Sequence, residues 1–93
     1  MPTHYDHDAN AKLDYSIDWS SWLPEGDTID EVTWSADAGL TLSSQSLAEG
    51  VATVWVEVAA GVPVGSVLRA TCRATTTQGR KDDRSLIFTV VSN

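Results

Sequence analysis

The chain has a single cysteine among its 93 residues. Cys72 can therefore form no intrachain disulfide, and a cysteine cluster that holds structural zinc is excluded. Nothing in the cysteine content requires an oxidising compartment. We interpret Cys72 as a small buried hydrophobic residue, since free cysteine is among the most buried residue types.

Long apolar runs are also missing from the sequence. No stretch approaches the roughly 18 consecutive apolar residues that span a bilayer. The first residues lack the basic and apolar regions of a secretory signal peptide. We therefore expect a soluble protein that is made in a cytoplasm and has no membrane partner.

Basic residues are scarce, with six Lys and Arg against 13 Asp and Glu and a net charge of -7. Nucleic acid is not an expected partner, because phosphate binding needs a basic face. The charge is uneven: residues 1–50 hold ten acidic residues and only Lys12 as a base, whereas residues 51–93 hold five basic and three acidic residues. This distribution allows head-to-tail contact between copies. The alternative is that both sets of charges are simply solvated.

The sequence contains no nucleophile elbow and no glycine-rich phosphate loop, and it has no histidine after residue 7 to serve as a base. Asp14 and Asp18 lie on one face of a predicted strand and could in principle act as acid and base. Nothing visible in the sequence would perturb the pKa values of these two carboxyl groups, so a solvated strand face is the simpler interpretation. We expect no enzymatic activity.

Residues 1–12 are polar and acidic and show no periodicity, which predicts a flexible N-terminal arm. Within it, His4, Asp6, His7 and Asp8 have side chains that can bind metals. A metal site needs ligands that the fold holds in place, and a mobile arm does not do this. We therefore expect no metal and no other cofactor.

A hydrophobic fraction of 42% and four tryptophans predict a folded domain after the arm. Apolar and polar residues alternate with the two-residue period of half-buried strands. Ile29 falls out of phase in its strand, which indicates a bulge. Residues 44–50 read as a polar connection and 78–81 as a hairpin turn. The predicted strands are 13–19, 28–36, 39–43, 51–58, 68–75 and 84–91.

The glycines, together with Pro24 and Pro63, lie between these strands, and no window carries a convincing helical stripe. Short alternating strands separated by regularly spaced turns are typical of β-sandwiches. We therefore predict one all-β domain over residues 13–93, an immunoglobulin-like antiparallel β-sandwich of six or seven strands.

The four tryptophans fall into two groups. Trp19 and Trp34 are in phase with apolar neighbours, which predicts core positions. Trp22 lies in a loop, and Trp55 faces away from a row of aliphatic residues, so both are candidates for exposed aromatic anchors. The alternative is that Trp22 closes one end of the sandwich and Trp55 covers its second face. Ile87, on the second face of the last strand, is further evidence for a covered or shared surface.

The segment LDYSIDWSSWL at residues 13–23, followed by GDTI at 26–29, resembles small virion proteins of tailed bacteriophages, the fibre-tail adaptor proteins. Further similar pieces are VTW at 32–34, AGLTL at 38–42, and GR with DDRS at 79–85. The similarity runs from about Asp8 to Val91. It implies a structural component of the virion, an adaptor or connector at the head-tail junction or tail, and no enzymatic activity.

The resemblance implies other phage structural proteins of the neck, tail or capsid as partners, and a location in the virion after synthesis in the host bacterial cytoplasm. We expect multiple copies to bind a symmetric assembly through loops and strand edges. The candidate partner-binding residues are Trp22, Asp27, Trp55 and Ile87. Two alternatives remain: a capsid decoration or cementing protein, and a carbohydrate-binding module in which Trp22 and Trp55 stack on sugar.

Overall fold

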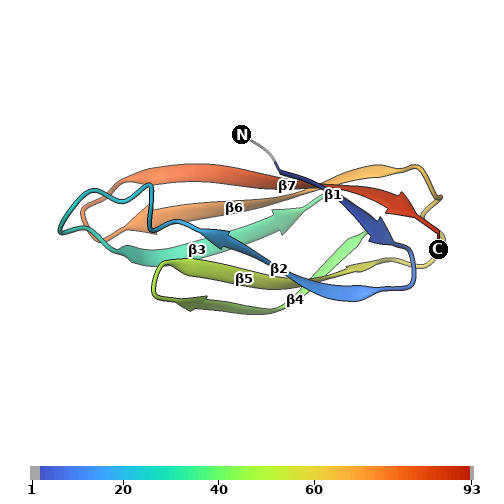
Figure 1. Cartoon of the computed structure of the whole chain (residues 1–93), viewed down its shortest axis with the longest axis horizontal. Coiled ribbons are helices and arrows are strands. Elements are labelled where there is room, and N and C mark those ends of the chain that lie inside the picture. Colours follow the sequence, from blue (N-terminus) through green and yellow to red (C-terminus); the bar gives the residue numbers. More distant parts are fainter. Residues whose placement is uncertain (1–2, 93) are drawn as a thin grey trace.

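The structure, a computed structural model, describes residues 3–92 and contains seven β-strands over that range (Figure 1). No helix long and apolar enough to cross a membrane occurs among these residues. The strands are β1 (Thr3–Asp8), β2 (Lys12–Asp18), β3 (Ile29–Ala36), β4 (Leu40–Ala48), β5 (Val51–Val58), β6 (Val67–Thr76) and β7 (Lys81–Val91).

The strands form two sheets that pack face to face, seen as the upper and lower layers of Figure 1. The four-stranded sheet has the order β1-β7-β6-β3, and the three-stranded sheet has the order β2-β5-β4. All neighbouring strands are antiparallel except β1, which runs parallel to β7. The predicted all-β sandwich is confirmed at this level.

The core lies between the sheets and follows the predicted alternation. Along the middle of β5 and β6 alternate side chains are fully buried: Ala52, Val54, Val56, Ala70, Cys72 and Ala74. Trp19 and Trp34 belong to the same core, as predicted. Burial raises the pKa of the Cys72 thiol to about 11, so it is protonated and unreactive at neutral pH. The predicted bulge near Ile29 is confirmed by a register shift between Ile29 and Glu31.

The predicted boundary of the strand after Gly39 is wrong. β4 continues to Ala48, so most of the predicted polar connection is strand. The reason is a register shift between Ser43 and Ser46, where Ser44 has a φ of 50°. A bulge reverses the alternation of faces, and the two halves therefore do not read as one periodic strand.

The structure also differs from the flexible N-terminal arm predicted for residues 1–12, of which residues 1–2 lie outside the described range. Residues 3–8 form β1, which pairs with β7 from Thr3 opposite Leu86 to Asp8 opposite Val91. Alternate residues of β1 face the core. Tyr5 packs against the core residues, and His7 is fully buried. Because histidine is not counted as an apolar residue, the alternation of inward and outward side chains along β1 was not visible in the sequence.

Candidate docking surface

Three chain segments meet at one end of the sandwich, on the left of Figure 1: the loop of residues 19–28, the turn between β4 and β5, and the hairpin between β6 and β7. We call this the loop end. Trp19 anchors it, because its backbone N–H donates to the carbonyl oxygen of Gly50 at 2.8 Å and its ring is fully buried. Trp22 packs edge-on against Trp19 with ring centroids 5.2 Å apart. Trp22 is therefore partly buried and held in one position.

Asp27 joins the loop to the β6–β7 hairpin. Its carboxylate accepts hydrogen bonds from the backbone N–H of Thr28 at 2.9 Å and of Gln78 at 3.2 Å. It also accepts from the Thr77 hydroxyl at 3.0 Å and from the Arg80 guanidinium at 2.9 Å. Only 6% of Asp27 is exposed. The structure thus places this candidate partner-binding residue inward, as a clamp between two segments.

The charge state of Asp27 follows from two opposing effects. Burial acts to raise the pKa of the carboxyl, but hydrogen bonds from the side chains of Thr76, Arg80 and Thr77 and from the Thr28 backbone outweigh it. Together they hold the pKa of Asp27 at about 2. The carboxylate is therefore ionised at neutral pH, and it neutralises Arg80.

A groove of about 370 Å³ opens beside this clamp. Its lining residues are Leu23, Thr28, Ile29, Leu47, Glu49 and Gly50. Leu47 is 37% exposed, which is high for a leucine in a strand. Glu49 and Gly50 have φ values of 51° and 79°, the backbone of a tight two-residue hairpin turn that fixes the wall of the groove. The sequence did not reveal Leu47 as a site residue, because it lay in the predicted polar connection.

Trp55 lies on a different surface. It stands on the central strand of the three-stranded sheet and points away from the core, opposite Asp14 of β2 and Ser43 of β4. Its exposed fraction is 36%, so the ring is accessible, and its role as an aromatic anchor stays a prediction. Trp55 and Trp22 therefore do not share one surface.

Ile87 lies on the outer face of the four-stranded sheet. Its register neighbours are His4 of β1 and Arg69 of β6. Only 6% of Ile87 is exposed, because strands flank it on both sides. It can therefore contribute the floor of a contact but little exposed surface.

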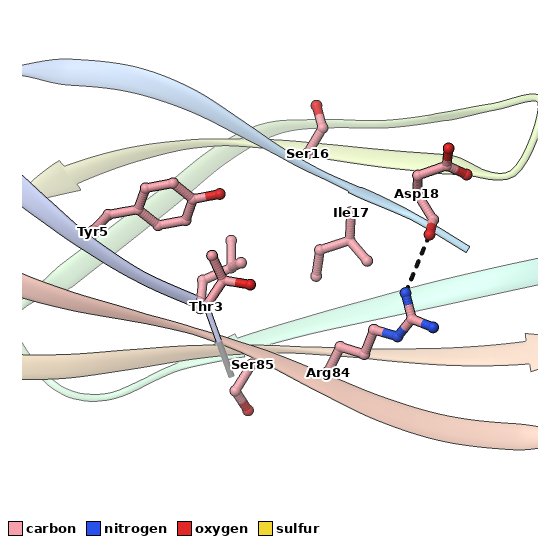
Figure 2. A pocket seen from close by; sticks show the side chains of 8 residues that line it. Thr3, Tyr5, Ser16, Ile17, Asp18, Arg84 and Ser85 are labelled. Carbon is pink, nitrogen blue, oxygen red and sulfur yellow. Dashed lines mark hydrogen bonds between the residues drawn. The ribbon is translucent and has the colours of Figure 1, made fainter. Parts of the chain in front are cut away.

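A further pocket of about 300 Å³ lies in the seam between the sheets (Figure 2). Arg84 crosses the seam and donates to the backbone carbonyl oxygen of Asp18 at 3.1 Å, the dashed line in Figure 2. The Asp18 carboxylate bonds the side chain and backbone of Ser20, and these bonds lower its pKa. Asp14 is not among the lining residues, so the pocket does not bring together the acid and base considered above.

The N-terminal side chains with metal-binding chemistry point in two directions. His4, Asp6 and Asp8 alternate with the buried His7, whose ring bonds Tyr15 and the carbonyl oxygen of Ala11. Within residues 3–92 no group of three or more His, Cys, Asp or Glu side chains is placed to hold a metal ion.

A comparison with protein-family models gives a match that covers most of the sandwich. The family model described as podophage GP4 fiber-tail adaptor protein gp77 matches residues 7–89. Comparison with curated proteins gives no match. The matched segment includes all three parts of the loop end and five complete strands, β2 to β6, together with most of β7. The chain therefore belongs to the podophage GP4 fiber-tail adaptor protein gp77 family.

Proposed function

We propose that this protein is a non-enzymatic structural adaptor in a phage tail, and that it docks on other tail proteins through the loop-end groove. The family match supports the adaptor role. We choose the groove as the docking surface because its lining is mostly apolar, with Leu47 exposed, and its walls are already held in place. The segment most similar to virion proteins, residues 13–29, forms the loop and one wall of this groove.

An immunoglobulin-like arrangement of the strands is part of this proposal. In that fold one sheet contains the strand order B-E-D and the other C-F-G. The orders β2-β5-β4 and β3-β6-β7 correspond to these two sheets when the strands are lettered along the chain. Such domains present binding loops at the ends of the sandwich, where the groove lies.

The chemistry of the groove suits an apolar side chain flanked by basic residues. Leu23, Ile29 and Leu47 supply the apolar walls, and Glu49 supplies a negative charge. The nearby basic side chain of the β6–β7 hairpin, Arg80, is bound by Asp27. The clamp and the tight turn already order the groove, so the binding of a partner includes little free-energy cost for ordering these segments.

The separation of Trp22 from Trp55 argues against the carbohydrate-binding alternative. Stacking on a sugar through both rings requires them on one surface. Trp22 instead packs against Trp19 at the loop end, and Trp55 lies on an outer sheet face. The protein-docking role does not require the two to act together.

The location in the virion extends the proposal to copies bound around the tail or at the head-tail junction, next to other phage structural proteins. Cryo-electron microscopy of purified particles tests this part. Density at the tail or neck is the expected result. Density over the head would instead make the protein a capsid decoration protein, and absence from the particle would overturn the virion role.

The groove is tested by Leu47→Asp, with Thr41→Asp on an exposed position of the same strand as the control. A carboxylate among the apolar walls opposes both burial and the existing Glu49 charge. We expect L47D to reduce incorporation into particles at least about tenfold, whereas T41D is incorporated normally. Thermal melting of both purified variants separates docking from folding. Normal incorporation of a folded L47D variant would contradict the assignment.

A further inference from the structure

We propose that copies of this protein also bind one another head to tail, with the outer face that carries Trp55 in one copy against the outer face that carries Arg69 in the next. This contact is separate from the loop-end groove. It concerns the two sheet faces, which lie on opposite sides of the sandwich (Figure 1).

The first face presents an aromatic ring in a polar surrounding. Trp55 is 36% exposed at the centre of the three-stranded sheet. Asp14 lies directly across from it on β2, and it has no ion-pair partner within 4 Å among residues 3–92. On the same face Glu57 is paired with Lys12 at 3.7 Å. The face thus offers one large apolar group with an unpaired negative charge directly beside it.

The second face presents a matching depression of about 420 Å³. Its lining residues are His4, Asp37, Val67, Leu68, Arg69 and Ile87. Val67 is 61% exposed and Ile87 supplies a buried apolar floor. Arg69 is exposed and forms no ion pair in the described part of the chain, in contrast to Arg73, whose guanidinium bonds Asp83 at 2.8 Å.

The two faces complement each other in three respects. The depression is large enough to receive one aromatic side chain, and Val67 and Ile87 give it apolar contact. The Arg69 guanidinium can lie over the indole ring of Trp55. It can also pair with Asp14 of the other copy, so that two side chains without an ion-pair partner among residues 3–92 meet at the contact. A second copy therefore satisfies features that the isolated chain leaves exposed.

The position of the faces determines the kind of assembly. A contact between two different faces is heterologous, so it uses one face of each copy and leaves the other free for the next. Repetition closes into a ring or continues as an open array. This geometry differs from a two-fold dimer, in which the same surface of both copies meets.

Sedimentation velocity of the purified full chain at increasing concentration tests the proposal directly. We expect concentration-dependent self-association that weakens when the salt concentration rises, because the unpaired charges contribute to it. Trp55→Ala should weaken self-association at least about tenfold. A wild-type protein that stays monomeric at the highest concentration would overturn the proposal. This holds even if Trp55 then contacts a different virion protein.

Charge reversal provides a sharper test that does not depend on one variant. Asp14→Arg places two cations at the contact, and Arg69→Asp places two anions there, so each variant alone should associate at least about tenfold more weakly. In an equimolar mixture the D14R and R69D copies can alternate along the assembly. Every contact then joins opposite charges, and the mixture should associate again. Lys81→Asp, exposed on β7 of the same sheet, is the control and should behave like the wild type.

A mixture that stays as weak as its components would refute the pairing of these faces. The result is independent of the loop-end groove, since the assay contains no tail protein. A wild-type protein that stays monomeric in solution but is incorporated normally into particles would refute this inference and leave the adaptor function intact.

Discussion

Replacing Tyr15 by phenylalanine is expected to destabilise the protein through a single buried ring nitrogen. The Nε2 atom of His7 lies 3.0 Å from the carbonyl oxygen of Ala11, and a carbonyl oxygen can only accept, so Nε2 carries the proton. In the neutral ring Nδ1 is then the acceptor. It lies 2.7 Å from the Tyr15 hydroxyl, which donates to it. The geometry thus defines the tautomer of His7.

The substitution removes one oxygen atom and little else. The ring of Tyr15 packs 4.8 Å from the ring centroids of both Tyr5 and Phe88, and phenylalanine keeps these contacts. Nδ1 of the fully buried His7 loses its partner. Leaving a buried acceptor without a hydrogen bond costs about 1–3 kcal/mol. For a domain of this size each kcal/mol lowers the melting temperature by roughly 4–8 °C.

Thermal melting and urea unfolding, followed by tryptophan fluorescence, measure the effect. Tyr5→Phe is the matched control, because the Tyr5 hydroxyl has no hydrogen bond within residues 3–92 while its ring occupies the same aromatic cluster. We expect Y5F to change the free energy of unfolding by less than about 0.5 kcal/mol. Equal stability of Y15F and wild type would refute the assigned hydrogen bond, and equal losses in both variants would assign the effect to ring packing.

Three further predictions concern the clamp, the seam and the core. The pKa of Asp27 is about 2 in the folded protein, below the ordinary carboxyl value, so the unfolded chain takes up the proton first as the pH falls. Its contribution to stability is present above about pH 4 and is lost towards pH 2, and Asp27→Asn should flatten this part of a stability–pH curve. Arg84→Lys removes the guanidinium that lies 4.5 Å from the Trp19 ring centroid. It should lower the free energy of unfolding in urea by about 0.5–1 kcal/mol and change the tryptophan emission, which an unaltered spectrum would contradict. Leu86→Ala, at a 2% exposed position, should cost about 2–5 kcal/mol in the same assay, whereas Leu13→Ala, at 46% exposure, should cost far less. Similar losses would place the core elsewhere.

Strands with strict alternation were predictable from the sequence because one of their faces is apolar over most of its length. β5 and β6 are of this kind. β1 was not predictable, since its inward-facing His7 is satisfied only by Tyr15 and by the Ala11 backbone, which a local pattern does not contain. The second half of β4 was missed for a different reason. Its bulge changes the face to which successive residues point, and no composition signal marks that change.

The candidate site residues divide in the same way. Trp55 could be recognised because its neighbours in sequence define which face it occupies. The role of Asp27 could not, because its partners Thr77, Gln78 and Arg80 lie 50 or more residues away. Ile87 was predicted to lie on a covered or shared surface because β7 has apolar residues on both faces, and the sequence did not distinguish the two cases. It is covered because β1 turns β7 into an inner strand, and β1 was the strand that the sequence did not reveal.

The edges of the two sheets bear on how partners bind. A strand edge is a favourable site for adding another strand only where it is long, flat and uncharged. β3 and β4, the edges on one side, both contain register shifts that bend them. The edges on the other side are β1 and β2, and charged or polar residues occupy every second position along them. Strand addition is therefore disfavoured at all four edges. The docking proposed at the loop-end groove and on the outer sheet faces uses side chains and therefore needs no strand addition at these edges.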